Sequence, residues 1–245
     1  MEGCFRVVTP VYNAEDYIGD CIKSLLEQTD KNWTQIIVDD CSSDDTLKRA
    51  KEAAGDDPRI TILSNQTRMG HCFNHIEIHN MHTKEEGDVF VHVDGDDRLL
   101  NKDALKHVRS VYFNNDVWST YGNYTSKTGN PSNCREVNLE EGIRNQILKK
   151  WPFSHLRTFK VFLWDYVEES DLQDSEGNPL TAAIDAAIMC PVLEKCGSRI
   201  AFIKDPLYFY NDDTGNNMHH VRLQEQVRCA YEVVAKSAKS AKRSL

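Results

Sequence analysis

Residues 34–54 read TQIIVDDCSSDDTLKRAKEAA, a short apolar run followed by a polar loop and a helix-like segment. The run at 34–38 is rich in β-branched residues, which favours a strand. The segment at 44–54 predicts a helix. The stretch therefore predicts one strand–helix unit with two carboxylates, Asp39 and Asp40, at the end of its strand.

The same alternation extends over the first ~115 residues. It predicts further strands at 4–9, 59–63 and 88–93 and helices at 16–28 and 70–79. Such repeats favour an α/β fold with a Rossmann-like, mainly parallel sheet and helices on both faces. Ligands of open parallel sheets bind beyond the carboxyl ends of the strands. We therefore expect the loops after these four strands to form a site at one edge of the sheet.

The remainder of the chain has a different pattern. Residues 115–180 are irregular and rich in aromatic residues, among them Trp151 and Trp164. A helix is predicted at 181–195, a strand at 200–203 and a final helix from about 221. The length of 245 residues favours a single α/β unit over two separate domains.

Composition excludes some classes of partner. The net charge of −9 argues against a nucleic acid as the main ligand. No apolar stretch approaches the ~20 residues of a membrane span, and the first residues lack the apolar core of a signal peptide. These features predict a cytoplasmic protein. The eight scattered cysteines contain no CxxC pair and indicate neither disulfide bonds nor zinc.

The last ten residues are basic, with Lys236, Lys239, Lys242 and Arg243. They follow an apolar stretch at 231–235. Two interpretations remain open, a solvated helix end and a weak contact with a membrane surface.

Three carboxylates follow the predicted strand at 88–93, namely Asp94, Asp96 and Asp97. Like charges this close repel one another unless a cation lies among them, and Mg²⁺ or Mn²⁺ suits carboxylate oxygens. The alternative is an acidic turn that caps a helix near residue 101. An EF-hand is excluded because Leu99 stands where its loop needs glycine. A haloacid-dehalogenase-type phosphatase is excluded because His92 stands in place of its nucleophilic Asp.

Three motifs of the first half resemble glycosyltransferase family 2, the inverting enzymes with the GT-A fold. They are TPVYN at 9–13, IIVDDCSSDDT at 36–46 and VDGDD at 93–97. Cys41 stands where the family usually has glycine, at a turn that often requires a positive φ.

The second half is similar to one subgroup of this family. The matching segments are PFSHLRTF at 152–159, IDAAIMCPVLE at 184–194 and PLYFYN at 206–211. The resemblance implies a nucleotide-sugar-binding half at 1–115, an acceptor-binding and catalytic half of the same domain at 116–220, and a helix with a basic tail at 221–245.

The resemblance also implies roles for donor-site residues. Pro10 and Tyr12 would line the pocket for the nucleobase, and Asp40 would contact the base. Arg68 and Asn74 would border the donor. Asp94 would lie near the ribose.

The expected cofactor is a divalent cation, Mn²⁺ or Mg²⁺. By the resemblance Asp96 and Asp97 would bind the metal and diphosphate, and His219 is a candidate third ligand, with a solvated loop histidine as the alternative. Asp185, a lone charge among small apolar residues, is the candidate general base. Its alternative role is that of a cap-like residue at a helix start.

The sequence thus predicts metal-assisted, inverting transfer of a sugar from a nucleoside-diphosphate sugar to a hydroxyl of a glycan or another acceptor. Two alternatives are a nucleotide-sugar-binding protein without transfer activity and a nucleotidyltransferase. The latter usually has a glycine-rich, basic loop after the first strand, which residues 12–16 do not form. His155 and Arg157 are further candidates for contacts with acceptor or phosphate.

Overall fold

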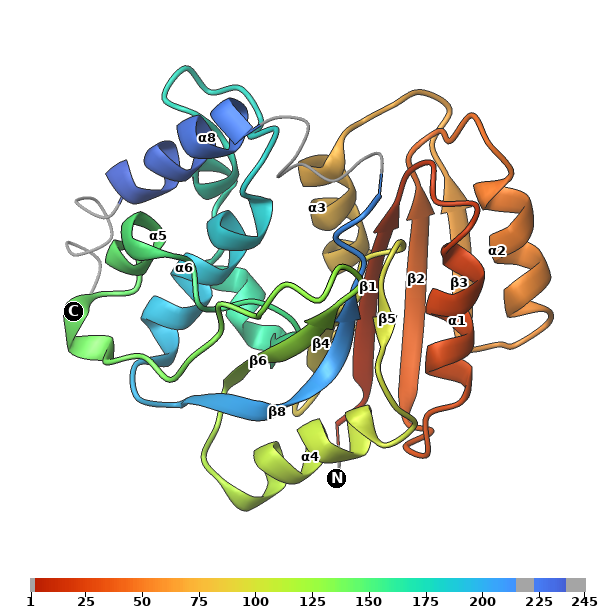
Figure 1. Ribbon diagram of the computed structural model, residues 1–245, viewed down its shortest axis with the longest axis horizontal. Helices are drawn as coiled ribbons and strands as arrows, with labels where there is room; N and C mark the ends of the chain where they lie inside the picture. Colours follow the sequence, from red (N-terminus) through yellow and green to blue (C-terminus); the bar gives the residue numbers. More distant parts are fainter. Residues whose placement is uncertain (1–2, 215–222, 237–245) are drawn as a thin grey trace.

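The computed structural model describes residues 3–214 and 223–236. Within them, eight strands form one sheet in the order β3-β2-β1-β4-β7-β6-β8-β5 (Figure 1). Four neighbouring strands are parallel: β1 (Phe5–Val11), β2 (Trp33–Asp39), β3 (Ile60–Ser64) and β4 (Val89–His92). The mainly parallel sheet expected from the sequence is confirmed.

Helices cover both faces of this sheet, which explains why all seven residues of β1 are buried. On one face the core includes residues of α1 (Ile18–Leu26), α2 (Thr46–Ala54) and α4 (Ala104–Asn114). On the other face it includes residues of α3 (His71–Met81) and α6 (Ile184–Cys196).

The second half of the chain extends the same sheet. Its strands are β6 (Ser119–Ser126), β7 (Arg157–Lys160) and β8 (Ile200–Tyr210), and the two-residue β5 (Arg98–Leu99) pairs with β8. Strand β7 lies between β4 and β6 and is antiparallel to both. In this register Arg157 pairs with His92, so the start of β7 lies at the edge where β4 ends.

The sequence pattern had indicated an irregular region at 115–180 and missed β6 and β7. The reason is that hydroxyl groups occupy part of their buried surface. Thr120 and Thr158 are fully buried, and their Oγ1 atoms lie 2.6 Å apart in a hydrogen bond. Ser119 Oγ donates to the carbonyl of Thr158 at 2.8 Å. Polar pairs of this kind satisfy a buried sheet without producing apolar alternation.

The remaining elements pack beside the second half of the sheet. They are η1 (Leu139–Glu141), α5 (Asn145–Lys149), η2 (Val161–Tyr166), η3 (Glu169–Leu172) and α8 (Leu223–Ala235). Figure 1 shows α5, α6 and α8 gathered on one side. Buried Arg144 joins them, because its guanidinium bonds Glu194 of α6 at 2.8 Å and the carbonyl of Val233 of α8 at 2.8 Å.

Most predicted boundaries differ from the structure by one or more residues, and the largest differences lie in the second half. The strand predicted at 200–203 continues to Tyr210, because residues 208–210 pair with β6 beyond a register shift. The helix predicted from 181 begins at Ile184. In the part of the chain that the structure describes, no helix has the length and apolarity needed to cross a membrane.

Candidate active site

Asp40 follows β2 and is held by a network of hydrogen bonds. Its Oδ1 accepts from the side-chain amide of Asn65 at 2.9 Å and from the backbone N–H of Met69 at 2.8 Å, and its Oδ2 accepts from the N–H of Gly70 at 2.9 Å. Asn65 also donates to Asn74 Oδ1 at 2.8 Å. Burial acts to raise the pKa of Asp40, but these bonds together lower it below its usual value. Asp40 is therefore a fixed anion.

The other residues predicted for the donor site lie around Asp40. The Arg68 guanidinium lies 3.7 Å from the centroid of the Tyr12 ring, and its Nε is 3.8 Å from Asp40 Oδ2. Pro10 is buried in β1, and its carbonyl accepts from the N–H of Gly95 at 3.2 Å. The structure thus brings five of the six predicted donor-site residues to the ends of β1 and β2, namely Pro10, Tyr12, Asp40, Arg68 and Asn74.

The turn after β2 keeps the positive φ that glycine usually supplies at this position of the family, although the residue here is Cys41. Cys41 is exposed and has a φ of 59°, in the left-handed region. A non-glycine residue pays about 1 kcal/mol or more for this conformation. Hydrogen bonds around the turn, such as that from the N–H of Ser42 to Asp39 Oδ2 at 3.3 Å, help to hold it.

The acidic turn after β4 packs against β1 through a glycine. A Cβ atom added at Gly95 would lie 2.5 Å from the Cβ of Val11 and 3.3 Å from the carbonyl oxygen of Pro10. Any side chain would therefore push the turn away from the donor loops. Gly95 allows the turn at 94–97 to approach the end of β1 closely.

Asp97 is directed into the protein. Its side chain is almost fully buried, at 2% exposure. Oδ2 accepts from the Tyr208 hydroxyl at 2.8 Å, and Oδ1 accepts from the backbone N–H of Asn211 at 2.7 Å. Burial, Asp96 and Asp94 raise the pKa of Asp97 well above its usual value. Asp97 thus joins the turn to β8, a role that the sequence did not show.

Asp94 and Asp96 carry less compensated charge. Burial and the charge of Asp94 raise the pKa of Asp96 to about 7. Asp94 Oδ1 is buried and accepts no hydrogen bond from the residues at 3–214 and 223–236. A buried acceptor and a carboxylate with a raised pKa are both expected where a cation is to bind.

Arg157 links the acidic turn to α6. Its side chain is 5% exposed, its Nη2 lies 3.5 Å from Asp94 Oδ2, and its Nη1 donates to Asp185 Oδ2 at 3.1 Å. Although burial acts to lower the pKa of Arg157, the two carboxylates raise it. The structure therefore places Asp94 and Asp185 at the two terminal nitrogens of one guanidinium.

Asp185 lies in the first turn of α6 but does not cap it. The N-cap is Ala183, which has a left-handed φ of 54° and makes no side-chain capping bond. A strained alanine directly before a candidate functional residue is a cost that active sites often carry. The Asp185 side chain remains 32% exposed, so a ligand can approach it.

His155 completes this side of the site. Its ring is stacked on Tyr208 at 4.5 Å and on Tyr210 at 5.3 Å. One ligand atom each of Asp94, Asp97 and His155 lie within 4.8 Å of one another. Burial lowers the pKa of His155 well below its usual value, so its imidazole is neutral.

Some other predicted residues lie elsewhere. His219 and the basic residues at 239–243 fall outside the described residues. Trp164, from the aromatic-rich region at 115–180, belongs to the core, since its indole stacks on His79 and donates to Asn80 Oδ1 at 3.0 Å. Tyr208 and Asn211 belong to the segment PLYFYN at 206–211, but no local pattern indicates their bonds to Asp97.

A hollow of about 530 Å³ lies beside the β2 loop, lined by residues that include Ser42, Lys48 and Asn65. None of the carboxylates after β4 lines it. The candidate site is therefore defined by the converging loops and not by this hollow.

A sequence profile described as glycosyl transferase family 2 matches residues 6–169. The chain belongs to this family. The matched stretch includes Asp40, the turn at 94–97 and Arg157 but ends before Asp185. Its relatives in the family include the glycosyltransferase GlyG of Streptococcus pneumoniae, 25% identical over 89% of this chain and 74% of GlyG.

Solved structures of similar shape show the type of fold. TarS of S. aureus in complex with UDP-GlcNAc has a TM-score of 0.69 at 22% identity, over 89% of this chain and 61% of that chain. The mannosyltransferase PcManGT of Pyrobaculum calidifontis, in complex with GDP-Man and Mn²⁺, has a TM-score of 0.62 at 17% identity, over 100% of this chain and 66% of that chain. The fold is therefore of the GT-A type. A Bacillus subtilis relative, EpsE, aligns over only 36% of its own length.

Proposed function

We propose that this family 2 chain is a glycosyltransferase that moves a sugar from a nucleoside-diphosphate sugar to a hydroxyl acceptor with inversion. One observation carries the proposal. Arg157 contacts both Asp94, in the acidic turn that also holds Asp96, and Asp185 on α6, at the sheet edge where the Asp40 network lies. These charged groups provide separate places for a nucleotide, a diphosphate and a reacting hydroxyl.

The donor would bind along the ends of β1, β2 and β4, in the half at 1–115. Asp40 offers a fixed acceptor for N–H groups of a base, and Tyr12 with Pro10 offers the apolar wall. Arg68 and Asn74 border the same place. Asp94, which follows β4, would lie near the ribose.

The residues present fit a divalent cation, Mn²⁺ or Mg²⁺. Asp96 would be its main carboxylate ligand, because its raised pKa marks repulsion that a cation relieves. Asp97 would contribute mainly by holding the turn, since both of its oxygens already accept hydrogen bonds. His219 stays a proposed further ligand. A cation bound here supplies charge stabilisation for the leaving diphosphate.

Asp185 would act as the general base, in the half at 116–220. The acceptor oxygen forms a bond to the anomeric carbon as the carbon–oxygen bond to the diphosphate breaks, and the hydroxyl proton passes to Asp185. Attack from the face opposite the leaving group inverts the configuration. Arg157 would orient Asp185 through the bond at 3.1 Å.

The test is a screen of nucleoside-diphosphate sugars with Mn²⁺, in which thermal stabilisation identifies the donor. Incubation with that donor should release the nucleoside diphosphate, and faster with an acceptor. Conversion of that donor to a nucleoside triphosphate and a sugar 1-phosphate when pyrophosphate is added would indicate a nucleotidyltransferase, and binding without turnover across an acceptor panel would indicate a binding protein. The anomeric configuration of the product, read by NMR, tests inversion.

A further inference from the structure

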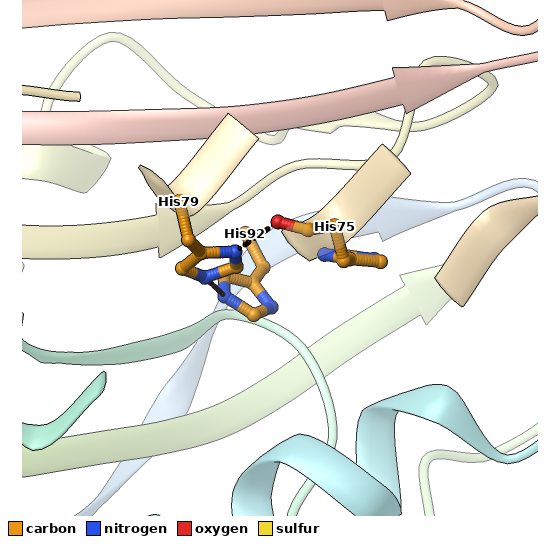
Figure 2. A group of neighbouring side chains, drawn as sticks. All are labelled: His75, His79 and His92. Atoms are coloured by element: carbon orange, nitrogen blue, oxygen red, sulfur yellow. Dashed lines mark hydrogen bonds between the residues drawn. The ribbon is translucent and has the colours of Figure 1, made fainter. Parts of the chain in front are cut away.

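Three buried histidines lie together beneath the donor site. His75 and His79 are four residues apart on α3, which places both on one face of the helix. His92 ends β4, two residues before Asp94. All three are at most 2% exposed, and Figure 2 shows their rings converging. One ring nitrogen from each lies within 4.8 Å of the others.

The hydrogen bonds of this trio fix one nitrogen as an acceptor. His79 Nδ1 lies 2.6 Å from the carbonyl oxygen of His75, so Nδ1 carries the proton and Nε2 presents a lone pair. That Nε2 lies 3.0 Å from His92 Nε2. An Nδ1–H bonded to a backbone carbonyl is the usual arrangement behind a metal-binding histidine.

Two further nitrogens are buried without partners. His75 Nδ1 and His92 Nδ1 accept or donate no hydrogen bond within the described part of the chain. Buried polar atoms normally have a partner, so the unpaired Nδ1 of His75 indicates that a ligand is lacking. Aromatic rings enclose the trio, with Trp164 4.0 Å and Phe90 4.6 Å from the ring of His79.

We propose that His75, His79 and His92 form a zinc site that is separate from the site for Mn²⁺ or Mg²⁺ at the carboxylates. Zn–N bonds of about 2.0–2.1 Å in a tetrahedral geometry place neighbouring nitrogens about 3.3 Å apart. The observed 3.0 Å between His79 and His92 requires only a small separation of the rings. The zinc replaces the proton shared by these two nitrogens.

The chemistry of the ligands selects the metal. Neutral imidazole suits Zn²⁺, whereas Mg²⁺ and Mn²⁺ favour oxygen ligands. The fourth position is left for a water molecule or for His71, whose Nε2 lies 3.1 Å from His75 Nε2.

The zinc site would join two elements that carry proposed donor-site residues, α3 and the end of β4. His75 is the neighbour of Asn74 on α3, and His92 precedes the acidic turn. A metal bound to both elements would fix the distance between them. Zinc therefore acts as a structural brace, and its binding does not depend on the proposed transfer reaction.

The experiment uses tag-free protein, stripped of metal and titrated with Zn²⁺. The wild type should bind one tightly held equivalent that survives excess Mg²⁺, and its melting temperature should rise. Co²⁺ in place of zinc should give the visible absorption of tetrahedral coordination. The variants His79→Gln and His92→Gln should lose this equivalent and the rise.

Two controls separate this site from other zinc-binding groups. His82 is also buried but bonds the carbonyl of Val7 at 3.0 Å outside the trio, so His82→Gln should keep the zinc. Asp96→Asn, which alters the carboxylate site, should keep it as well. Absence of a tight equivalent from the wild type overturns the proposal, and so does zinc that is lost in Asp96→Asn but retained in His79→Gln. The wild-type and Asp96→Asn results decide the question even if the core variants fail to fold.

Discussion

Asp40 and the acidic turn at 94–97 lie at the same sheet edge but differ in how their negative charge is compensated. Asp40 receives three close hydrogen bonds, two of them from backbone N–H groups, and has a lowered pKa. The turn concentrates three carboxylates, and the pKa of Asp96 rises to about 7. Hydrogen bonds within the fold compensate the charge of Asp40, whereas the charge of the turn is compensated only when a ligand binds.

We expect the largest effect on turnover from a substitution of Asp185, the proposed general base. Asp185→Asn keeps the size of the side chain but cannot accept the hydroxyl proton, so the turnover number should fall by ~10²–10⁴. Donor affinity should change little. Measurement at saturating donor and acceptor, with a circular dichroism check of folding, decides the point. Near-normal turnover would leave Asp185 as a helix residue and move the base elsewhere.

The turn itself gives the next effect. Asp96→Asn removes the proposed metal ligand, and turnover should fall by ~10²–10³, the range for loss of a group that stabilises transition-state charge. Its melting temperature should hold or rise, because repulsion by Asp94 disappears. Kinetics with graded Mn²⁺ and calorimetry test both expectations. Full activity of the wild type in a chelator would contradict the metal assignment.

Asp97→Asn is the matched comparison with Asp96→Asn. An amide in place of Asp97 must turn its NH₂ group toward the hydroxyl of Tyr208 or the N–H of Asn211. Leaving one such buried donor unpaired costs about 1–3 kcal/mol of stability. Urea denaturation should therefore show a loss for Asp97→Asn that is absent from Asp96→Asn. Equal stability of the two variants would mean that both carboxylates play the same part.

The same reasoning predicts a stability loss at Asp40. Asp40→Asn sets an NH₂ group against N–H donors and should cost about 1–3 kcal/mol, together with a weaker donor affinity. The midpoint of urea unfolding and the donor Kd measure the two effects. If unfolding is unaffected while donor binding weakens, the Asp40 network is less completely formed than described.

The smallest expected effect concerns His82, which is buried. Burial lowers the pKa of His82 from 6.5 to about 4, so the folded chain binds fewer protons than the unfolded chain between these values. Stability must then fall as pH falls from about 6.5 toward 4, and by pH 5 this histidine accounts for about 2 kcal/mol. Denaturation at pH 7 and pH 5 should show a smaller drop for His82→Gln than for the wild type. Equal drops would contradict the shift.

The sequence predicted the parts of the fold that depend on local pattern. The β-branched strands and the loops that follow them placed Asp40 and Asp94 at one edge, and the motif spacing identified the family. The bonds from Tyr208 and Asn211 to Asp97 join residues 111 and 114 positions apart, and no local pattern encodes them. Similarly, His75 and His79 show helical spacing, but nothing in the sequence pairs them with His92.

The position of β7 also sets an order of events during folding. Strand β1 pairs with β2, and β2 with β3, through short βα units, whereas the β1–β4 ladder joins residues 5–8 to 89–92 and the β4–β7 ladder joins residues 89–92 to 157–160. Closing these two long loops is entropically slower than forming the local contacts of β1 to β3. We therefore expect Arg157 to reach Asp94 late, after the loop that holds Asp40 has formed. In a refolding experiment, recovery of nucleotide binding should precede recovery of turnover.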